Sequence, residues 1–184
     1  MSSVIISGDT SGSITLSAPA VAGTNTITLP ASTGTVVTTG SPQSGSVLQV
    51  VQGTVAGKIT TSSTSFVTTG LAANITPKFS NSKILATVTL VGCFTVASNR
   101  ELSATLYRDA TNIAPTGTGS NKALGWLYNP SAGTGGNLTF SYLDSPATTS
   151  STAYTVYFAS AGGGVVDINE NSFTSTIVLQ EIAG

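Results

Sequence analysis

The sequence predicts an all-β protein: an antiparallel β-sandwich of jelly-roll type, preceded by a short-stranded N-terminal β segment. Three observations predict this class. From about residue 60 onward, apolar and polar residues alternate with period two in separated runs. Clusters of Gly, Pro, Asn and Ser separate these runs, as turns separate the strands of a sandwich. No window of helical length carries an apolar stripe with a helical period.

The polar surface is expected to consist of hydroxyl groups rather than charges. The chain of 184 residues has 26 Ser and 31 Thr, but only 6 Lys and Arg and 7 Asp and Glu. Charged residues make up 7% of the chain, whereas about 25% is typical of soluble domains. With 40% hydrophobic residues and a net charge of -1, the composition excludes general disorder, which combines low hydrophobicity with high net charge.

Residues 1–40 form the N-terminal segment, whose strands are expected to be short. Three β-prone triplets lie at residues 14–16, 27–29 and 35–37, separated by turn-forming residues. Such short strands cannot form a stable sheet alone, so the segment is expected to need strands from another chain or another protein. A loose low-complexity leader is the alternative, but the alternating Val, Ile and Leu argue against it.

Residues 41–59 are interpreted as a linker followed by one strand, and residues 60–184 as the sandwich domain. The longest uncharged hydrophobic stretch, residues 84–96, is interrupted by Thr and Gly, which indicates a strand rather than a membrane-spanning helix. Its alternation places Cys93 on one face. The other face is expected to hold Ala86, Val88, Leu90, Gly92, Phe94 and Val96. The remaining strands are expected at residues 64–69, 102–106, 124–128, 138–143, 154–159, 164–168 and 175–182.

Residue composition excludes several classes of function. Nucleic-acid binding requires a basic patch, and six scattered cations cannot form one. His is absent and Cys93 stands alone, which excludes an internal disulfide, a His/Cys zinc site and a Ser-His-Asp or Cys-His nucleophile. No cofactor and no membrane insertion are expected. The first residues lack the pattern of a secretory signal, so synthesis in a cytosol is expected.

Paired carboxylates are the remaining option for catalysis, because glycoside hydrolysis needs two of them about 5 to 10 Å apart. The candidate pairs are Asp167 with Glu170 and Glu101 with Asp109. The first pair is interpreted more simply as part of a turn, and the second as strand-end residues. The chain is therefore predicted not to be an enzyme.

The same turn resembles the start of a calcium loop. Asp167, Asn169 and Asn171 offer oxygen donors at alternate positions. An EF-hand is excluded, because Ser172 and Val178 stand where that motif needs Gly and Glu. No metal site is predicted, and an improvised calcium site is the alternative to an Asx-rich turn.

Trp126, Tyr128 and Asn129 are the candidate contact residues for a host-surface glycan or protein. They place aromatic rings beside an amide donor. Because large aromatic side chains are on average highly buried, core packing is the competing interpretation. Gly- and Ser-rich loops at residues 116–121 and 131–137 are further candidates, since loops on a rigid scaffold often carry recognition.

Two stretches resemble parts of tailed-bacteriophage virion proteins, especially tail-fibre and appendage proteins. The first, within residues 14–37, contains ITLSAP, GTNTITLP and GTVV. The second comprises LYRD at 106–109, YLDSP at 142–146, YTV at 154–156 and STIVLQEI at 175–182. The resemblance implies a homotrimeric virion component, with an N-terminal segment that attaches to the particle or forms a thin stem and a C-terminal β knob at the outer end.

The leading hypothesis is a non-enzymatic structural protein of a tailed phage virion, made in the host bacterial cytoplasm. It would be a short homotrimeric fibre- or spike-like appendage that binds other virion proteins through its N-terminal segment and contacts the host surface through its knob. The chain has almost no shaft and no Gly-X-Y repeat, so a capsid decoration or head-fibre protein is the alternative. A carbohydrate-binding module or a carbohydrate depolymerase is a third hypothesis, which leaves the uncharged N-terminal segment without a role.

Overall fold

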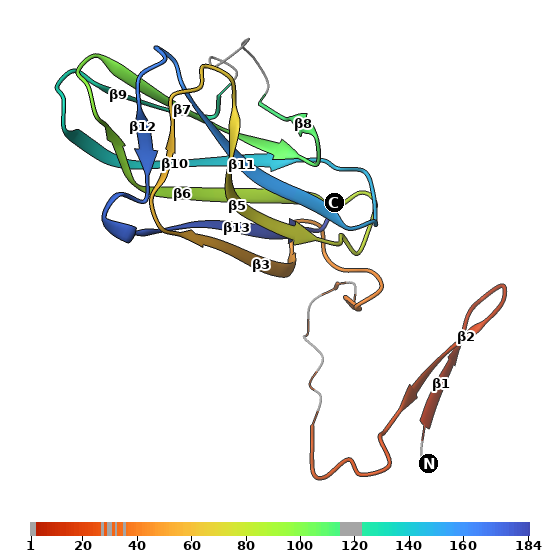
Figure 1. Cartoon of the computed structure of the whole chain (residues 1–184). Coiled ribbons are helices and arrows are strands. Elements are labelled where there is room, and N and C mark those ends of the chain that lie inside the picture. Colours follow the sequence, from red (N-terminus) through yellow and green to blue (C-terminus); the bar gives the residue numbers. More distant parts are fainter. Residues whose placement is uncertain (1–2, 27, 29–30, 32, 35, 115–122) are drawn as a thin grey trace. The chain divides into compact units, whose positions relative to one another are not determined.

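The computed structural model describes residues 3–26, 28, 31, 33–34, 36–114 and 123–184. The chain divides into two compact units, Met1–Val36 and Val37–Gly184 (Figure 1), and each is described by itself. Both units consist of strands and connecting loops. Across the described ranges, the one helical element is a short 3-10 turn, η2 (Glu170–Ser172).

The N-terminal unit contains an antiparallel hairpin of β1 (Ser3–Ser7) and β2 (Ser13–Ser17). The Gly8 amide donates to the Gly12 carbonyl at 3.0 Å. Gly12 has a φ of +78°, a conformation that glycine adopts without steric cost, and this closes the turn.

The expected N-terminal strands agree with this unit in part. The triplet at residues 14–16 lies in β2, whereas sequence reasoning did not identify β1. The triplets at residues 27–29 and 35–37 include residues that lie outside the described ranges. Val36 and Val37, which are described, do not belong to a strand.

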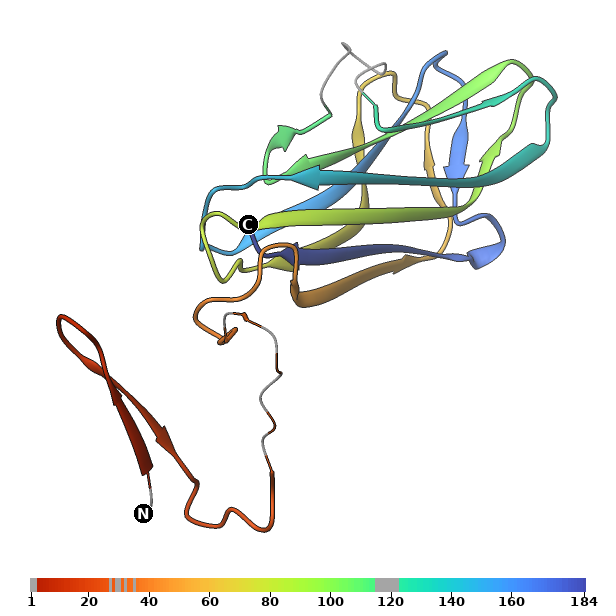
Figure 2. The same cartoon turned by 180° about the vertical axis from the view of Figure 1, so that it is seen from behind.

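The second unit is an antiparallel β-sandwich of a six-stranded and a five-stranded sheet (Figures 1 and 2). Its long strands follow the order β3-β13-β6-β10 in the first sheet and β5-β11-β7-β9 in the second. This order is that of a jelly roll, in which two Greek keys are folded together, so the predicted fold class is confirmed. The strand bounds are β3 (Val47–Ala56), β5 (Val67–Ile75), β6 (Lys83–Thr95), β7 (Arg100–Arg108), β9 (Gly125–Asn129), β10 (Thr134–Asp144), β11 (Thr152–Ser160) and β13 (Thr174–Ile182).

Three short strands complete the sheets. β8 (Thr111–Asn112) pairs with the end of β7. In the first sheet, β12 (Val166–Ile168) pairs both with β4 (Ile59–Thr61) and with the end of β6. β4 follows β3 after a two-residue break, and β12 precedes β13 across the loop that holds η2. The break between β3 and β4 and the loop between β12 and β13 therefore lie at the same place in the first sheet.

The inward-facing residues of both sheets form one apolar core, as the period-two alternation predicts. Alternate positions of β6 and β13 from the first sheet meet alternate positions of β5, β7 and β11 from the second. The largest fully buried apolar side chains are Leu71, Ile75, Ile84, Leu90, Leu102, Leu106, Tyr154, Phe158, Ile168, Ile177 and Leu179.

A β-bulge interrupts the alternation in β6. Gly136 of β10 pairs with Cys93 and Leu138 pairs with Leu90, so the two residues Val91 and Gly92 lie opposite one residue of β10. Gly92 has a φ of +58°. Such a conformation is costly for any residue with a Cβ, which explains the glycine at this position.

The bulge reverses the two faces of β6. Beyond it, Cys93 and Thr95 are fully buried, whereas Phe94 is half-buried and Val96 is exposed. The expectation that Gly92, Phe94 and Val96 continue the core face is therefore wrong, because one extra residue shifts every later side chain to the opposite face. Burial raises the pKa of the Cys93 thiol to about 12, so this group is an unreactive core residue.

The sandwich begins before residue 60. β3 pairs with β13 along its length, from Ala56 opposite Thr174 to Val47 opposite Ile182. Two backbone hydrogen bonds extend this pairing, from Gly45 N to the Ala183 carbonyl at 2.8 Å and from Ala183 N to the Ser46 carbonyl at 2.9 Å. The strand expected within residues 41–59 is therefore an integral strand of the sandwich.

Candidate functional site

Trp126 and Tyr128 form a pair of exposed aromatic rings on β9. They are alternate residues of one strand, so both side chains project from the outer face of the second sheet. Trp126 is 56% exposed and Tyr128 is 41% exposed. The ring planes are within 9° of parallel and their centroids are 6.1 Å apart. The pair lies on the surface, not in the core that the competing interpretation predicted.

A hydrogen bond fixes the second ring of the pair. The Tyr128 hydroxyl donates to Asn99 Oδ1 at 2.7 Å. Asn129, the third candidate residue, lies on the other face of β9 and is buried. Its Nδ2 donates to the Thr134 carbonyl at 2.9 Å, which holds the connection between β9 and β10. The structure therefore brings two of the three candidates together and gives Asn129 a structural role.

Two further aromatic residues on the same sheet face were missed by sequence reasoning. Tyr107 of β7 stacks on Tyr157 of β11, with ring centroids 4.0 Å apart. Tyr157 lies opposite Thr105, and Trp126 lies opposite Ser103, so these small hydroxyl residues of β7 separate the two aromatic pairs. The sequence places Tyr107 and Tyr157 fifty residues apart, and strand pairing brings them together.

One charged residue lies on the same sheet face as these rings. The outward positions of β5, β7, β9 and β11 are all described, and Glu101 is the charged residue among them. Glu101 lies opposite Tyr128. We call the outward residues Glu101, Trp126 and Tyr128 the β9 platform.

The outer face of the first sheet has a different character. Twelve outward residues form three cross-strand rows over β3, β13, β6 and β10, and none is charged. We call them the uncharged grid. Val50 and Leu143, at two corners of the grid, are 58% and 50% exposed. The rows are Val50, Gln180, Leu85 and Leu143; Gln52, Val178, Thr87 and Ser141; and Thr54, Thr176, Thr89 and Thr139.

The carboxylates of Asp167 and Glu170 hold a lysine. Lys58 Nζ lies 3.0 Å from Asp167 Oδ2 and 2.7 Å from Glu170 Oε2. The hydrogen bonds to Glu170 and Asp167 raise the pKa of Lys58 above its ordinary value. Asp167 is fully buried and accepts a further 2.6 Å hydrogen bond from Thr60. This arrangement ties β4, β12 and η2 together where the sheet is interrupted.

Of the other two candidate calcium ligands, Asn169 has structural partners. Asn169 is buried, with Nδ2 donating to the Val55 carbonyl at 3.1 Å and Oδ1 accepting from Ser175 Oγ at 2.6 Å. Asn169 and Asn171 have φ values of 57° and 59°, which Asn tolerates better than most residues. In this part of the chain an ammonium group occupies the position that a cation would take, and the geometry is that of the Asx-rich turn.

The second candidate carboxylate pair is far apart. Glu101 is near the start of β7 and Asp109 directly follows its end. Eight residues of extended strand separate the two by about 26 Å, well beyond the spacing for glycoside hydrolysis. Asp109 Oδ1 instead accepts a hydrogen bond from the Ala153 amide at 3.1 Å.

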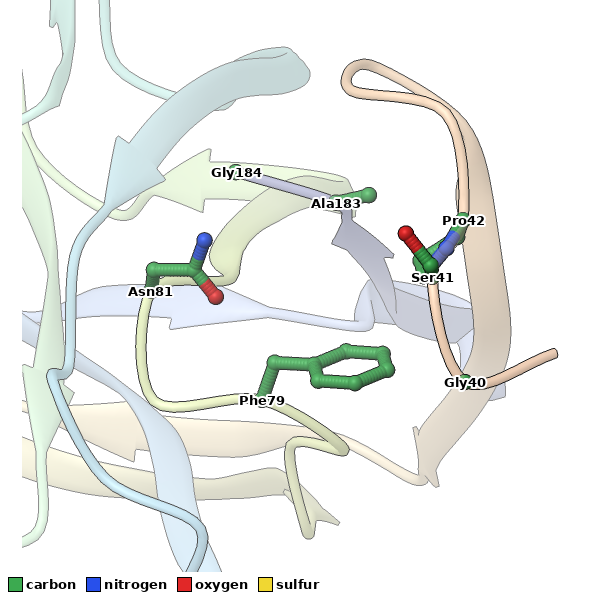
Figure 3. A pocket seen from close by; sticks show the side chains of 7 residues that line it. All are labelled: Gly40, Ser41, Pro42, Phe79, Asn81, Ala183 and Gly184. Atoms are coloured by element: carbon green, nitrogen blue, oxygen red, sulfur yellow. The ribbon is translucent and has the colours of Figure 1, made fainter. Parts of the chain in front are cut away.

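A pocket of about 200 Å³ lies where the chain enters the sandwich (Figure 3). The Phe79 ring and the Asn81 amide face the backbone of Ser41 and Pro42 across it. Gly40, Ala183 and Gly184 complete the lining, which contains no charged side chain. Ser41 supplies a hydroxyl to the lining, and no acidic or basic side chain accompanies it there. The loop at residues 116–121 lies outside the described ranges, and residues 134–137 of the other candidate loop belong to β10.

The hairpin of the N-terminal unit exposes apolar side chains on both faces. Val4 pairs with Leu16 and Ile6 with Ile14 on one face, and Ile5 projects from the other. All five are between 55% and 66% exposed. A two-stranded hairpin by itself is marginally stable in water.

Comparisons with known proteins identify no family. No known protein family and no curated protein matches the sequence. A solved structure described as that of the Gx strain of infectious bursal disease virus is similar to this chain at 16% identity, with a TM-score of 0.35. The similarity covers 98% of this chain and 46% of the virus chain, so the chain spans less than half the length of that relative. Over the residues described, no helix is long and apolar enough to span a membrane.

Proposed function

We propose that the chain is a non-enzymatic structural protein of a tailed phage virion, a short homotrimeric fibre- or spike-like appendage that contacts the host surface. The observation that carries this proposal is the uncharged grid on the first sheet. The sequence resemblance to phage appendage proteins supports it independently. On this proposal the protein is made in the host bacterial cytoplasm and acts as part of the particle.

The chemistry of the uncharged grid suits packing between copies of the chain. Burying an unpaired charge in an interface is costly, and like charges that face each other repel. A face of Thr, Ser, Gln, Val and Leu avoids both penalties. Hydroxyl groups can donate and accept, so around a threefold axis one side of the grid can bond to the opposite side of the next copy's grid. Closed rotational symmetry then limits the assembly, and we expect the trimer to bury roughly 2,000 to 5,000 Å².

The N-terminal unit is proposed to attach the trimer to the particle. Its hairpin exposes apolar residues on both faces, and Asp9 is its one charged residue. Strands of the other copies or of another virion protein would cover these faces and edges. The composition of this segment, without charges from residue 10 to residue 57, matches a permanently covered structure.

Light scattering on the purified chain tests the oligomeric part of the proposal. We expect three times the mass of the 18.3 kDa chain. Thr87→Lys places a charge inside the grid and should give a folded monomer. Thr155→Lys is the matched control, because Thr155 is an outward residue of β11 in the second sheet, and should stay trimeric. A stable native monomer at micromolar concentration would refute the proposal.

The position on the particle separates a tail appendage from a capsid decoration or head-fibre protein. Virions whose genome encodes this chain can be labelled with antibodies against the sandwich and imaged by electron microscopy. Label at the tail supports the appendage, whereas label spread over the head supports decoration. Absence of the chain from purified virions would overturn both.

A further inference from the structure

We infer that the β9 platform binds a neutral carbohydrate, with Trp126 and Tyr128 as the stacking residues. This inference deepens the proposed function, on which it rests, by naming the class of host-surface molecule. A pyranose ring presents a flat face of C–H groups bordered by hydroxyls. Aromatic faces carry negative charge density, which attracts such polarised C–H groups.

The exposure of the two rings is not explained by folding. Trp126 is the single Trp of the chain, and the core consists mainly of aliphatic residues together with Phe140, Tyr154 and Phe158. Yet Trp126 and Tyr128 stay 56% and 41% exposed beside each other. Large amphipathic rings on a surface are typical of binding hot spots, where a ligand completes their burial.

The rings are held ready for a ligand. Both belong to a strand that is hydrogen-bonded to β7, and the Tyr128 hydroxyl is fixed by Asn99. The ring planes are within 9° of parallel. Because little side-chain freedom remains to be lost, binding costs less entropy than on a mobile loop.

The charges nearby indicate a neutral ligand. Glu101 lies opposite Tyr128, and the outward positions of β5, β7, β9 and β11 include no cation. Among these described positions, an acidic sugar polymer would therefore meet a carboxylate and no counter-charge. The Glu101 carboxylate can accept hydrogen bonds from the hydroxyl groups of a neutral sugar.

The position of the platform leaves it free in the proposed assembly. It lies on the outer face of the second sheet, whereas the uncharged grid lies on the outer face of the first. Packing through the grid thus turns the platform away from the other copies. A second copy at the platform is the competing occupant, and the experiment below includes it.

Because Trp126 is the single Trp, its fluorescence reports on this site alone. The full-length chain is titrated with neutral glucose, mannose and galactose oligosaccharides and with polygalacturonate as the acidic comparison. We expect a saturable change in emission with at least one neutral series and none with polygalacturonate. Tyr128→Ala should weaken binding at least tenfold by fluorescence, and Trp126→Ala likewise by calorimetry. Phe173→Ala removes another exposed ring and should bind as the native chain does.

Three results would overturn the inference: no saturable binding to any neutral series, binding of polygalacturonate alone, or unchanged affinity in both ring variants. Light scattering on the same samples separates the two proposals. A native trimer without sugar binding would refute the platform and leave the proposed function standing. Dissociation of the Trp126→Ala trimer would show that a second copy occupies this face, which also refutes the platform.

Discussion

The Tyr154 hydroxyl donates a 2.6 Å hydrogen bond to Asp144 Oδ2, and this bond joins the two sheets of the sandwich. Tyr154 is a fully buried residue of β11, and Asp144 ends β10 in the opposite sheet. Arg108 Nη1 contacts both carboxylate oxygens at 2.9 Å. Burial, followed by the bond to Asp144, raises the pKa of Tyr154 far above its ordinary value. The phenol therefore remains a donor at every pH at which the fold persists.

We expect Tyr154→Phe to destabilise the sandwich by about 1.5 to 3 kcal/mol, the usual contribution of a hydrogen bond to a charged group. Urea denaturation of the purified chain at fixed concentration measures the loss. Tyr142→Phe is the matched control, because Tyr142 lies on β10, the strand of Asp144, and forms no hydrogen bond with a described residue. Equal losses in both variants would contradict this role for the bond.

Glu181 should give the protein an acid-sensitive stability. Burial alone would raise the pKa of Glu181, but hydrogen bonds from Ser82, Gln49 and the backbone of Lys78 and Phe79 outweigh it and hold the pKa below its ordinary value. These bonds to Ser82 and Gln49 are 2.7 and 2.6 Å long. The stabilisation is therefore present above the unfolded pKa of about 4.3 and is lost as pH falls through the folded pKa.

The measurement is the thermal midpoint Tm as a function of pH. With no His in the chain, we expect Tm to be nearly flat from about pH 5.5 to 8 and to fall below about pH 4.3. Glu181→Gln should have a lower Tm at pH 7 and a shallower decline in acid. If the Tm of the native chain instead rises as the pH falls, this role of Glu181 is refuted.

Gly92→Ala should destabilise more than an ordinary substitution in a turn. A Cβ at Gly92 would lie 2.8 Å from Phe173 Cδ2 and 3.0 Å from Glu170 N, in a residue with positive φ. We expect a loss of about 2 to 5 kcal/mol from strain and overpacking combined. Gly57→Ala isolates the strain, because Gly57 has a φ of +84° and open space around it, and should lose only about 1 to 2 kcal/mol.

Calcium should not stabilise the native chain. The Lys58 ammonium already pairs with both the Asp167 and the Glu170 carboxylates, so millimolar calcium or a chelator should leave Tm unchanged. Lys58→Met should lower Tm at neutral pH, because the buried Asp167 carboxylate loses its cation. An increase in the native Tm on calcium addition would instead show that the 167–171 turn is a metal site.

Deleting residues 1–36 should leave the sandwich folded and trimeric. This prediction rests on two observations. The chain divides between Val36 and Val37, and hydrogen bonds close the sandwich at Gly45 and Ser46. The truncated chain should no longer join particles in a phage that lacks the full-length protein. Circular dichroism and light scattering check the fold first, and failure to fold would show that the hairpin is part of the folding unit.

The sequence by itself determined the class of fold and the composition of its surfaces. Period-two alternation is a local property, and it located β7, β10, β11 and β13 because each strand buries every second side chain. The scarcity of charged residues is likewise evident in the sequence alone, and it predicts broad uncharged faces. Trp126 and Tyr128 were recognised as candidate contact residues from their residue types alone.

Only the tertiary structure decided which residues meet. The bulge at Gly92 depends on the register between β6 and β10, and it placed Cys93 in the core against the local pattern. The stacking of Tyr107 on Tyr157 requires the pairing of β7 with β11. Lys58 and Asp167 are more than one hundred residues apart in sequence, yet they form an ion pair. Strand register and cross-strand contacts are set by packing between residues that are far apart in the sequence. A short stretch of sequence therefore cannot predict them.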